Sequence, residues 1–121
     1  EIKRKNFRVY QEALQDIPGL ILVSEPSFGH SNYWYYTLIL DSKKFGQTHL
    51  ELRQKLREEG IESKPIWTLN HHQKPYKKNL AYNITNAEDL YRQCLNLPCS
   101  IGLAAHEIAM ITQVIRSAYG S

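Results

Sequence analysis

Residues 32–40, with the sequence NYWYYTLIL, are the feature that most constrains the fold of this chain. Almost every position is aromatic, β-branched or aliphatic, which is typical of a β-strand and leaves no continuous polar face for solvent. A strand of this kind needs cover on both sides. We therefore expect residues 32–40 to form a central strand, with the rest of the chain supplying the layers around it.

An amphipathic helix is predicted before this strand. Apolar side chains recur there at spacings of three and four residues, at Phe7, Tyr10, Leu14 and Ile17. This spacing places them on one face of a helix, while lysine and glutamate fill the other face. Pro18 and Gly19 then end the helix, because proline cannot continue it and glycine suits the turn that follows.

Two capping-box patterns predict the starts of further helices. Thr48 is followed three residues later by Glu51, and Thr85 by Glu88. In such a box the threonine hydroxyl and the glutamate carboxylate satisfy backbone N–H groups that the helix leaves free. Gly60 is expected to end the helix that begins at Thr48, as a residue in the left-handed conformation.

The remaining patterns give the fold class. Short apolar runs at 20–23 and 61–66 predict strands, and Pro65 places the second at an edge or a strand end. A last helix is expected over 103–119. The chain of 121 residues is the size of one domain. We expect an α+β fold in which a small, mainly antiparallel sheet of about three strands is covered by three or four helices.

Charge and hydropathy exclude several classes of protein. The net charge is only +3, with 15 basic residues interleaved with 12 acidic ones, which does not favour a nucleic-acid-binding protein. No run approaches the roughly 18 apolar residues of a membrane span. The two cysteines, Cys94 and Cys99, do not make a disulfide framework, so we expect reduced thiols and a cytoplasmic protein.

Residues 62–76 predict a binding loop. The segment holds two histidines, a tryptophan and two prolines, and is longer than most connections within a compact domain. Trp67 argues against disorder, because disordered segments lack large apolar anchors. From the residues alone, His71 has the simpler role of hydrogen bonding to the loop backbone, and Trp67, like Trp34, is a core or interface anchor.

No complete catalytic or metal-binding constellation is visible. His71 and His72 are adjacent, but a zinc site needs three or four ligands, and the sequence offers no others at suitable spacing. We therefore predict neither a metal site nor a catalytic residue in this chain. Glu88 is assigned to a helix surface, and no nucleophile is accompanied by its base.

The order and spacing of several short motifs resemble one family. The motifs are Arg4-Lys5-Asn6-Phe7, Ser31-Asn32-Tyr33-Trp34, Gly60-Ile61-Glu62-Ser63-Lys64-Pro65-Ile66-Trp67, His71-x-Gln73-x-Pro75-Tyr76-Lys77, Asn86-Ala87-Glu88 and Asn96-Leu97-Pro98-Cys99-Ser100. Over nearly the whole chain they resemble the C-terminal domain of the DegT/DnrJ family of pyridoxal-phosphate-dependent sugar aminotransferases. The motifs around Trp34 and Trp67 are most similar to the branch that aminates UDP-linked 4-keto sugars of the bacillosamine or legionaminic acid type.

The resemblance implies the small domain of a fold-type-I transferase that works in polysaccharide biosynthesis. Such an enzyme would move an amino group from glutamate to a keto-sugar nucleotide through pyridoxal phosphate, as a cytoplasmic homodimer. Its cofactor domain, with the Schiff-base lysine, precedes the segment seen here. We accordingly expect residues 1–121 to be a single C-terminal domain excised from a longer chain, inactive alone and without bound cofactor.

The resemblance also implies roles for individual residues. Lys64, Trp67, His71 and Gln73 would bind the nucleotide-sugar substrate, and Asn32 and Trp34 would face the cofactor domain or the partner subunit. A binding site for a sugar nucleotide requires a cation for the diphosphate, an aromatic face for the base or sugar, and groups that bind hydroxyls.

The sequence departs from the family pattern at two positions. Relatives usually have arginine where this chain has Lys64, so a bidentate fork is replaced by a point charge. Relatives also begin the last helix with a serine or threonine cap, whereas this chain has Ala104 there.

Two other functions remain open on the sequence. The chain could be a stand-alone, non-enzymatic binding module of the same fold, which would be distinguished by a source gene without an upstream cofactor domain. It could also be a small nucleic-acid binder that uses its basic and aromatic residues, and this would show as strongly salt-dependent binding.

Overall fold

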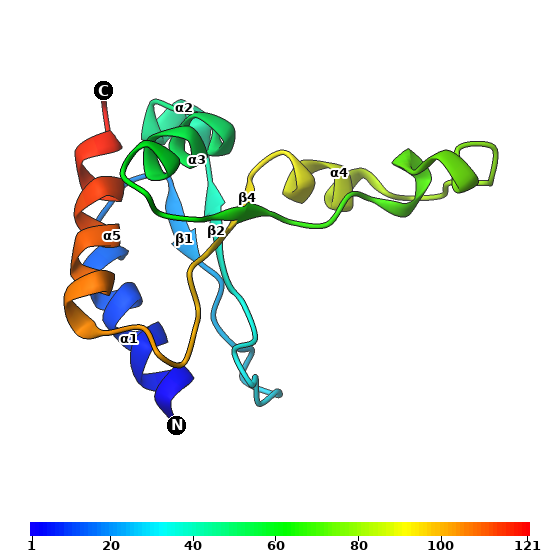
Figure 1. Cartoon of the computed structure of the whole chain (residues 1–121). Coiled ribbons are helices and arrows are strands. Elements are labelled where there is room, and N and C mark those ends of the chain that lie inside the picture. Colours follow the sequence, from blue (N-terminus) through cyan, green and yellow to red (C-terminus); the bar gives the residue numbers. More distant parts are fainter.

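The computed structural model describes residues 1–121 and has an α+β fold (Figure 1). A four-stranded antiparallel sheet, with strand order β1-β2-β4-β3, is combined with five α-helices and two 3-10 turns. The elements are α1 (Ile2–Leu14), β1 (Leu20–Leu22), β2 (Tyr36–Leu40), α2 (Ser42–Phe45), α3 (His49–Glu58), β3 (Lys64–Pro65), η1 (Asn70–His72), η2 (Lys74–Tyr76), α4 (Thr85–Tyr91), β4 (Cys94–Leu97) and α5 (Ala105–Ala118).

The core lies between the sheet and the helices α1, α3 and α5. Strand β2 is internal, as predicted, with β1 on one side and β4 on the other. Tyr36, Leu38 and Leu40 alternate into the core, whereas Thr37 and Ile39 point to the opposite face and remain half-buried. The helices thus cover one face of β2 fully, and the expectation that both faces are covered was wrong for this chain.

The strand predicted over residues 32–40 begins only at Tyr36. Upstream, Tyr33 adopts a left-handed conformation with φ of +50°. The hydroxyl of Ser31 accepts a hydrogen bond from the backbone N–H of Tyr33, and the amide oxygen of Asn32 accepts one from Trp34. Short polar side chains that bond to the backbone two residues on replace the strand ladder with a turn.

The sheet has one more strand than expected, and its edge strand is shorter. Residues 94–97 pair with both β2 and β3, which makes β4 an internal strand that the sequence does not predict. The predicted strand 61–66 is limited to Lys64 and Pro65. Pro65 has no N–H to donate, so its position on the edge strand β3 agrees with the prediction.

One predicted capping box forms and the other does not. At the start of α3, Thr48 Oγ1 accepts from the N–H of Glu51, and Glu51 Oε2 accepts from the N–H of Thr48. Helix α4 has no side-chain cap at all. The carboxylate of Glu88 is turned instead toward two histidines, because ring N–H groups compete successfully for the oxygen that a cap would use.

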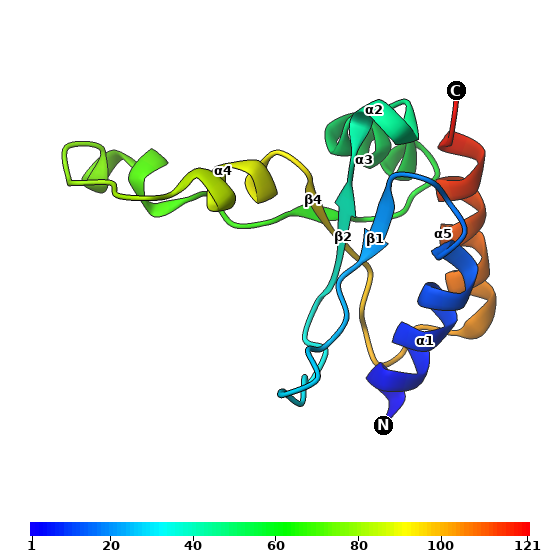
Figure 2. The ribbon, with the colours of Figure 1, turned by 180° about the vertical axis from the view of Figure 1, so that it is seen from behind.

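Residues 66–92 project from the body as an arm (Figures 1 and 2). The arm contains η1, η2 and α4, and it leaves from β3 and returns to β4. The segment between β1 and β2 projects in a different direction as a second, shorter extension. No helix of the structure has the length and apolar character needed to cross a membrane.

Candidate functional site

Three aromatic side chains meet where the arm leaves the sheet. The Tyr35 ring stacks on Trp34, with centroids 5.5 Å apart, and meets Trp67 edge-on at 5.3 Å. Trp34 and Trp67 are 65% and 69% exposed, so neither is a core residue. Such large exposed rings, placed side by side on a folded domain, are typical of a surface that contacts a ligand or another protein surface.

The backbone of Trp34 is fixed from two directions. Its carbonyl oxygen accepts from Lys3 Nζ at 2.8 Å and from the thiol of Cys99 at 3.1 Å. Asn32 contributes to the same turn, because its side-chain oxygen accepts from the N–H of Trp34. The backbone of Trp34 is therefore anchored, while its ring is exposed beside Tyr35.

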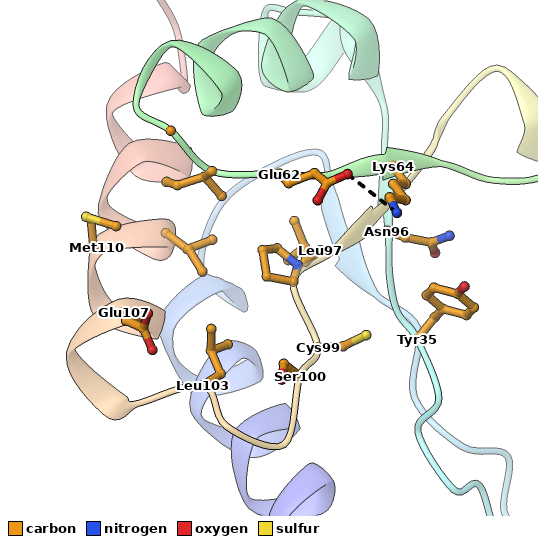
Figure 3. A pocket seen from close by; sticks show the side chains of 14 residues that line it. Tyr35, Glu62, Lys64, Asn96, Leu97, Cys99, Ser100, Leu103, Glu107 and Met110 are labelled. Atoms are coloured by element: carbon orange, nitrogen blue, oxygen red, sulfur yellow. Dashed lines mark ion pairs between the residues drawn. The ribbon is translucent and has the colours of Figure 1, made fainter.

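A cleft of about 470 Å³ lies next to these rings, between β3, β4 and the start of α5 (Figure 3). Its polar lining comes from Tyr35, Glu62, Lys64, Asn96, Ser100 and Glu107. Lys64 Nζ lies 3.4 Å from Glu62 Oε1 but remains mostly exposed. Because this ion pair is open to solvent, it holds the ammonium only weakly, and Lys64 is available to an anion.

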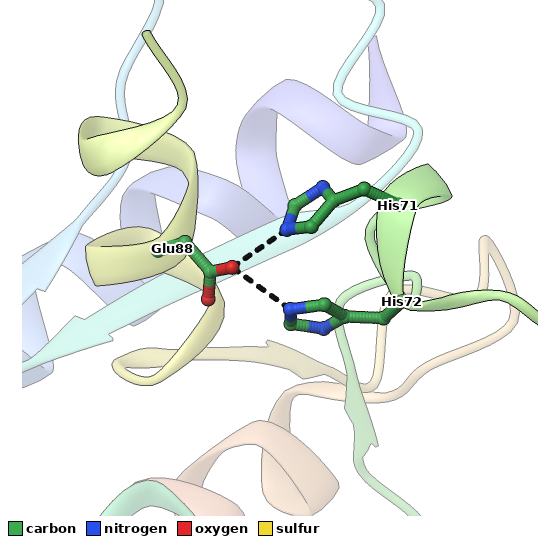
Figure 4. A group of neighbouring side chains, drawn as sticks. All are labelled: His71, His72 and Glu88. Atoms are coloured by element: carbon green, nitrogen blue, oxygen red, sulfur yellow. Dashed lines mark hydrogen bonds and ion pairs between the residues drawn. The ribbon is translucent and has the colours of Figure 1, made fainter. Parts of the chain in front are cut away.

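His71 sits farther along the arm, in a cluster with His72 and Glu88 (Figure 4). The Nε2 atoms of His71 and His72 lie 2.6 and 2.8 Å from the same oxygen, Oε1 of Glu88. Hydrogen bonding from His71, followed by that from His72, lowers the pKa of the Glu88 carboxyl. His71 also borders a hollow of about 430 Å³ formed by residues of the arm.

The structure groups the predicted substrate-binding residues in two places. Lys64 lines the cleft, and Tyr35 connects that cleft to Trp67. His71 and Gln73 belong to the arm and do not line the cleft. Gln73 Nε2 donates to the carbonyl of Thr68 at 3.2 Å, so its side chain also shapes the loop.

Sequence reasoning missed three residues of this region. The sequence predicts a strand position for Tyr35 and a helix-capping role for Glu88, and it predicts no separate role for Asn96. The Asn96 side chain accepts from Thr37 Oγ1 at 2.8 Å, which fixes it across the β2–β4 pair. The Asn96-Leu97-Pro98 motif, which is part of the family resemblance, marked this segment, but no sequence pattern shows that β4 borders a cleft.

An ion pair attaches the extension between β1 and β2 to α1. Both guanidinium nitrogens of Arg4 donate to the Glu25 carboxylate, at 2.7 and 2.9 Å, and Arg4 also donates to the carbonyl of Ser31. The N–H of Ser31 donates to Glu25 Oε2 at 2.8 Å. The extension that presents Asn32 and Trp34 therefore depends on this charged contact.

Acid is expected to weaken this attachment. The Arg4 hydrogen bonds, followed by that from Ser31, lower the pKa of Glu25 from 4.5 to about 2. Because the folded-state pKa is depressed, the stabilisation is complete above pH 4.5 and is lost as the pH falls toward 2. Urea unfolding measured across that window should show a steeper loss of stability for the wild type than for Glu25→Gln; equal slopes would contradict this role.

The chain is similar to known aminotransferases along nearly its whole length. The family model of the DegT/DnrJ/EryC1/StrS aminotransferases matches residues 1–116. EpsN of Bacillus subtilis, a candidate pyridoxal phosphate-dependent aminotransferase, is 30% identical over 119 residues, which are 95% of this chain and 30% of EpsN. SpsC of Bacillus subtilis, a spore coat polysaccharide biosynthesis protein, is 29% identical over 111 residues, 88% of this chain and 28% of SpsC.

The fold agrees with that of a solved relative. The crystal structure of DesI in the presence of its TDP-sugar product superposes with a TM-score of 0.88 at 22% identity, over 95% of this chain and 30% of DesI. The chain thus spans about 30% of the length of these proteins. Because the family model matches residues 1–116, which are nearly the whole chain, this chain belongs to the DegT/DnrJ/EryC1/StrS aminotransferase family.

Proposed function

We propose that this chain is the C-terminal domain of a sugar-nucleotide aminotransferase, which transfers an amino group from glutamate to a keto-sugar nucleotide through pyridoxal phosphate. The observation that carries the proposal is the cleft beside the exposed aromatic rings, with Lys64 at its wall, in a chain of this family. The proposed role of the domain is to bind part of the substrate and to contact the cofactor domain. We further propose a role in the synthesis of polysaccharide precursors, which is supported by the similarity to SpsC, a polysaccharide biosynthesis protein.

The proposed chemistry of binding follows from the residues at the cleft. Lys64 would place a positive charge against the diphosphate, replacing its contact with Glu62. Trp67 and Tyr35 would offer flat apolar surface to the base or the sugar. His71 and Gln73, on the arm, would reach hydroxyl groups at the other end of the same extended ligand.

The cofactor is assigned to another part of the enzyme. Pyridoxal phosphate needs an enclosed lysine for its aldehyde and a cup of donors for its phosphate. Lys64, the lysine that lines the cleft, is mostly exposed, so the cleft does not enclose a lysine in the way that a pyridoxal phosphate site requires. The cleft therefore does not fit a complete cofactor site, and we propose that an upstream domain supplies it.

Contacts with that domain, or with the second subunit of a homodimer, are proposed for the exposed aromatic surface. Asn32 and Trp34 lie on the extension before β2, where the backbone of Trp34 is anchored and its ring is exposed. Ile21 and Val23, at the outer strand β1, are also exposed. Apolar side chains left open on one domain are commonly covered by a neighbouring one in the assembled enzyme.

The test uses the product of the complete source gene, assayed for transamination of a UDP-linked keto sugar. Lys64→Ala should raise KM about 10- to 100-fold, because a charge-assisted contact to phosphate of about 1.5–3 kcal/mol is lost. Lys64→Arg should retain most of the affinity, because the positive charge remains. Lys44→Ala, which removes an exposed lysine of α2 outside the cleft, is the matched control.

Two results would contradict the proposal. The first is an unchanged KM for Lys64→Ala, which would remove Lys64 from the substrate site. The second is a gene product that has no pyridoxal phosphate absorbance and no upstream cofactor domain, which would leave a binding module. Purification of the intact protein and an absorbance scan test the second outcome before any variant is made.

A further inference from the structure

The two adjacent histidines of η1 converge on one carboxylate oxygen of α4. His71 Nε2 and His72 Nε2 lie 2.6 and 2.8 Å from Glu88 Oε1. Glu88 is 17 positions from His71 and 16 from His72 in the sequence, so the fold brings the three side chains together. The three side chains are between 20% and 36% exposed. Figure 4 shows both rings directed at the same atom. The second carboxylate oxygen faces Arg92, at 3.6 Å.

The distances favour hydrogen bonds over shared coordination of a metal ion. Ligands that surround zinc tetrahedrally at about 2.0–2.1 Å are separated from one another by roughly 3.3 Å. Both nitrogen–oxygen separations in the cluster are shorter than that and match charge-assisted hydrogen bonds. The three side chains therefore form a hydrogen-bonded cluster in which one carboxylate oxygen of Glu88 accepts from two imidazole N–H groups.

This geometry fixes where the imidazole protons are. An ionised carboxylate only accepts hydrogen bonds, so each Nε2 must carry a proton. In a neutral imidazole the other nitrogen then has a free lone pair. The lowered pKa of Glu88 keeps its carboxyl ionised, which agrees with this arrangement. Nδ1 of His71 takes no part in the bond to Glu88, and this nitrogen is left as an acceptor.

We propose that Glu88 is a positioning residue that holds His71 with Nε2–H inward and Nδ1 outward, so that His71 presents a hydrogen-bond acceptor to a hydroxyl or N–H group of the substrate. This inference rests on the proposed function for the contact between His71 and substrate. His72 supports the arrangement as the second donor to Glu88. A histidine of fixed tautomer selects for a donor at one position of the sugar, which makes Glu88 a determinant of specificity.

The first experiment tests the tautomer without any assay of function. Long-range ¹H–¹⁵N spectra of the imidazole rings are recorded on the uniformly labelled 121-residue chain above neutral pH. We expect a protonated Nε2 and an unprotonated Nδ1 for His71 in the wild type. Glu88→Ala should give a mixture of the two tautomers, whereas Glu88→Gln should restore the wild-type pattern, because its amide oxygen still accepts from Nε2.

Two controls make this result specific. Asp89→Ala removes the neighbouring carboxylate of α4, which makes no hydrogen bond or ion pair to either histidine, and should leave the His71 spectrum unchanged. Addition of one equivalent of Zn²⁺ should not displace the proton from Nε2. A wild-type chain with protonated Nδ1, or with stoichiometric zinc on both Nε2 atoms, would overturn the proposal.

The second experiment connects the tautomer to the reaction, in the complete enzyme. Glu88→Ala should raise KM for the keto-sugar nucleotide up to about tenfold, and Glu88→Gln should recover most of the affinity. Against a substrate analogue lacking the donor that His71 accepts, wild type and Glu88→Ala should perform equally. If the tautomer changes as expected in the spectra but KM does not, the proposed substrate contact fails while the positioning of His71 stands as a structural property.

Discussion

Gly19→Ala is expected to destabilise the chain by at least about 3 kcal/mol. Gly19 has a φ of +83°, and a Cβ atom there would lie 2.7 Å from the backbone nitrogen of Phe45 and 2.9 Å from the carbonyl oxygen of Asp41. Both are backbone atoms, so no flexible side chain can move aside. The same turn is tied to α2 by a hydrogen bond from the N–H of Asp41 to the carbonyl of Gly19, at 2.8 Å.

Gly60→Ala is the matched control for this prediction. Gly60 also has a left-handed φ, of +73°, but a Cβ atom there would meet nothing within 4 Å. The substitution should cost only the conformational penalty of about 1–2 kcal/mol. Urea unfolding followed by circular dichroism gives both values. Equal losses for the two variants would show that close packing at Gly19 does not matter.

Tyr36→Ala is expected to cost about 3–5 kcal/mol, as for other large aromatic residues of a core. Tyr36 is fully buried at the start of β2, and its ring contacts those of Phe7, Tyr10 and Tyr33. Its hydroxyl donates to the carbonyl of Lys3 at 2.8 Å. The substitution would leave a cavity between α1 and the sheet and would remove the bond to the helix.

Tyr36→Phe separates these two contributions. The ring stays and only the hydroxyl is lost, so the expected cost is about 1 kcal/mol. The measurement is again the free energy of unfolding in urea. A loss as large for Tyr36→Phe as for Tyr36→Ala would mean that the hydrogen bond, and not ring packing, holds α1 against β2. Because Lys3 also bonds to Trp34, loosening α1 should disturb the exposed aromatic surface as well.

The sequence determined the elements whose signals are local. The apolar spacing of Phe7, Tyr10 and Leu14 predicted α1, and all three side chains are buried in it. Thr48 and Glu51 predicted the start of α3, because a capping box satisfies backbone groups with neighbours only three residues away. The order of the motifs was enough to indicate the family, since spacing along the chain is itself a sequence property.

Tertiary structure decided the features that depend on distant partners. Glu88 has the sequence of a cap, yet His71 and His72 take its carboxylate, because the fold brings η1 against α4. Residues 94–97 become an internal strand only because β2 and β3 are both there to pair with them. The cleft likewise joins Tyr35, Lys64 and Asn96 from three strands or their flanks, and no local pattern encodes that meeting. A hydrogen bond or packing contact between distant segments depends on the path of the whole chain, which is why these features emerge only in the folded molecule.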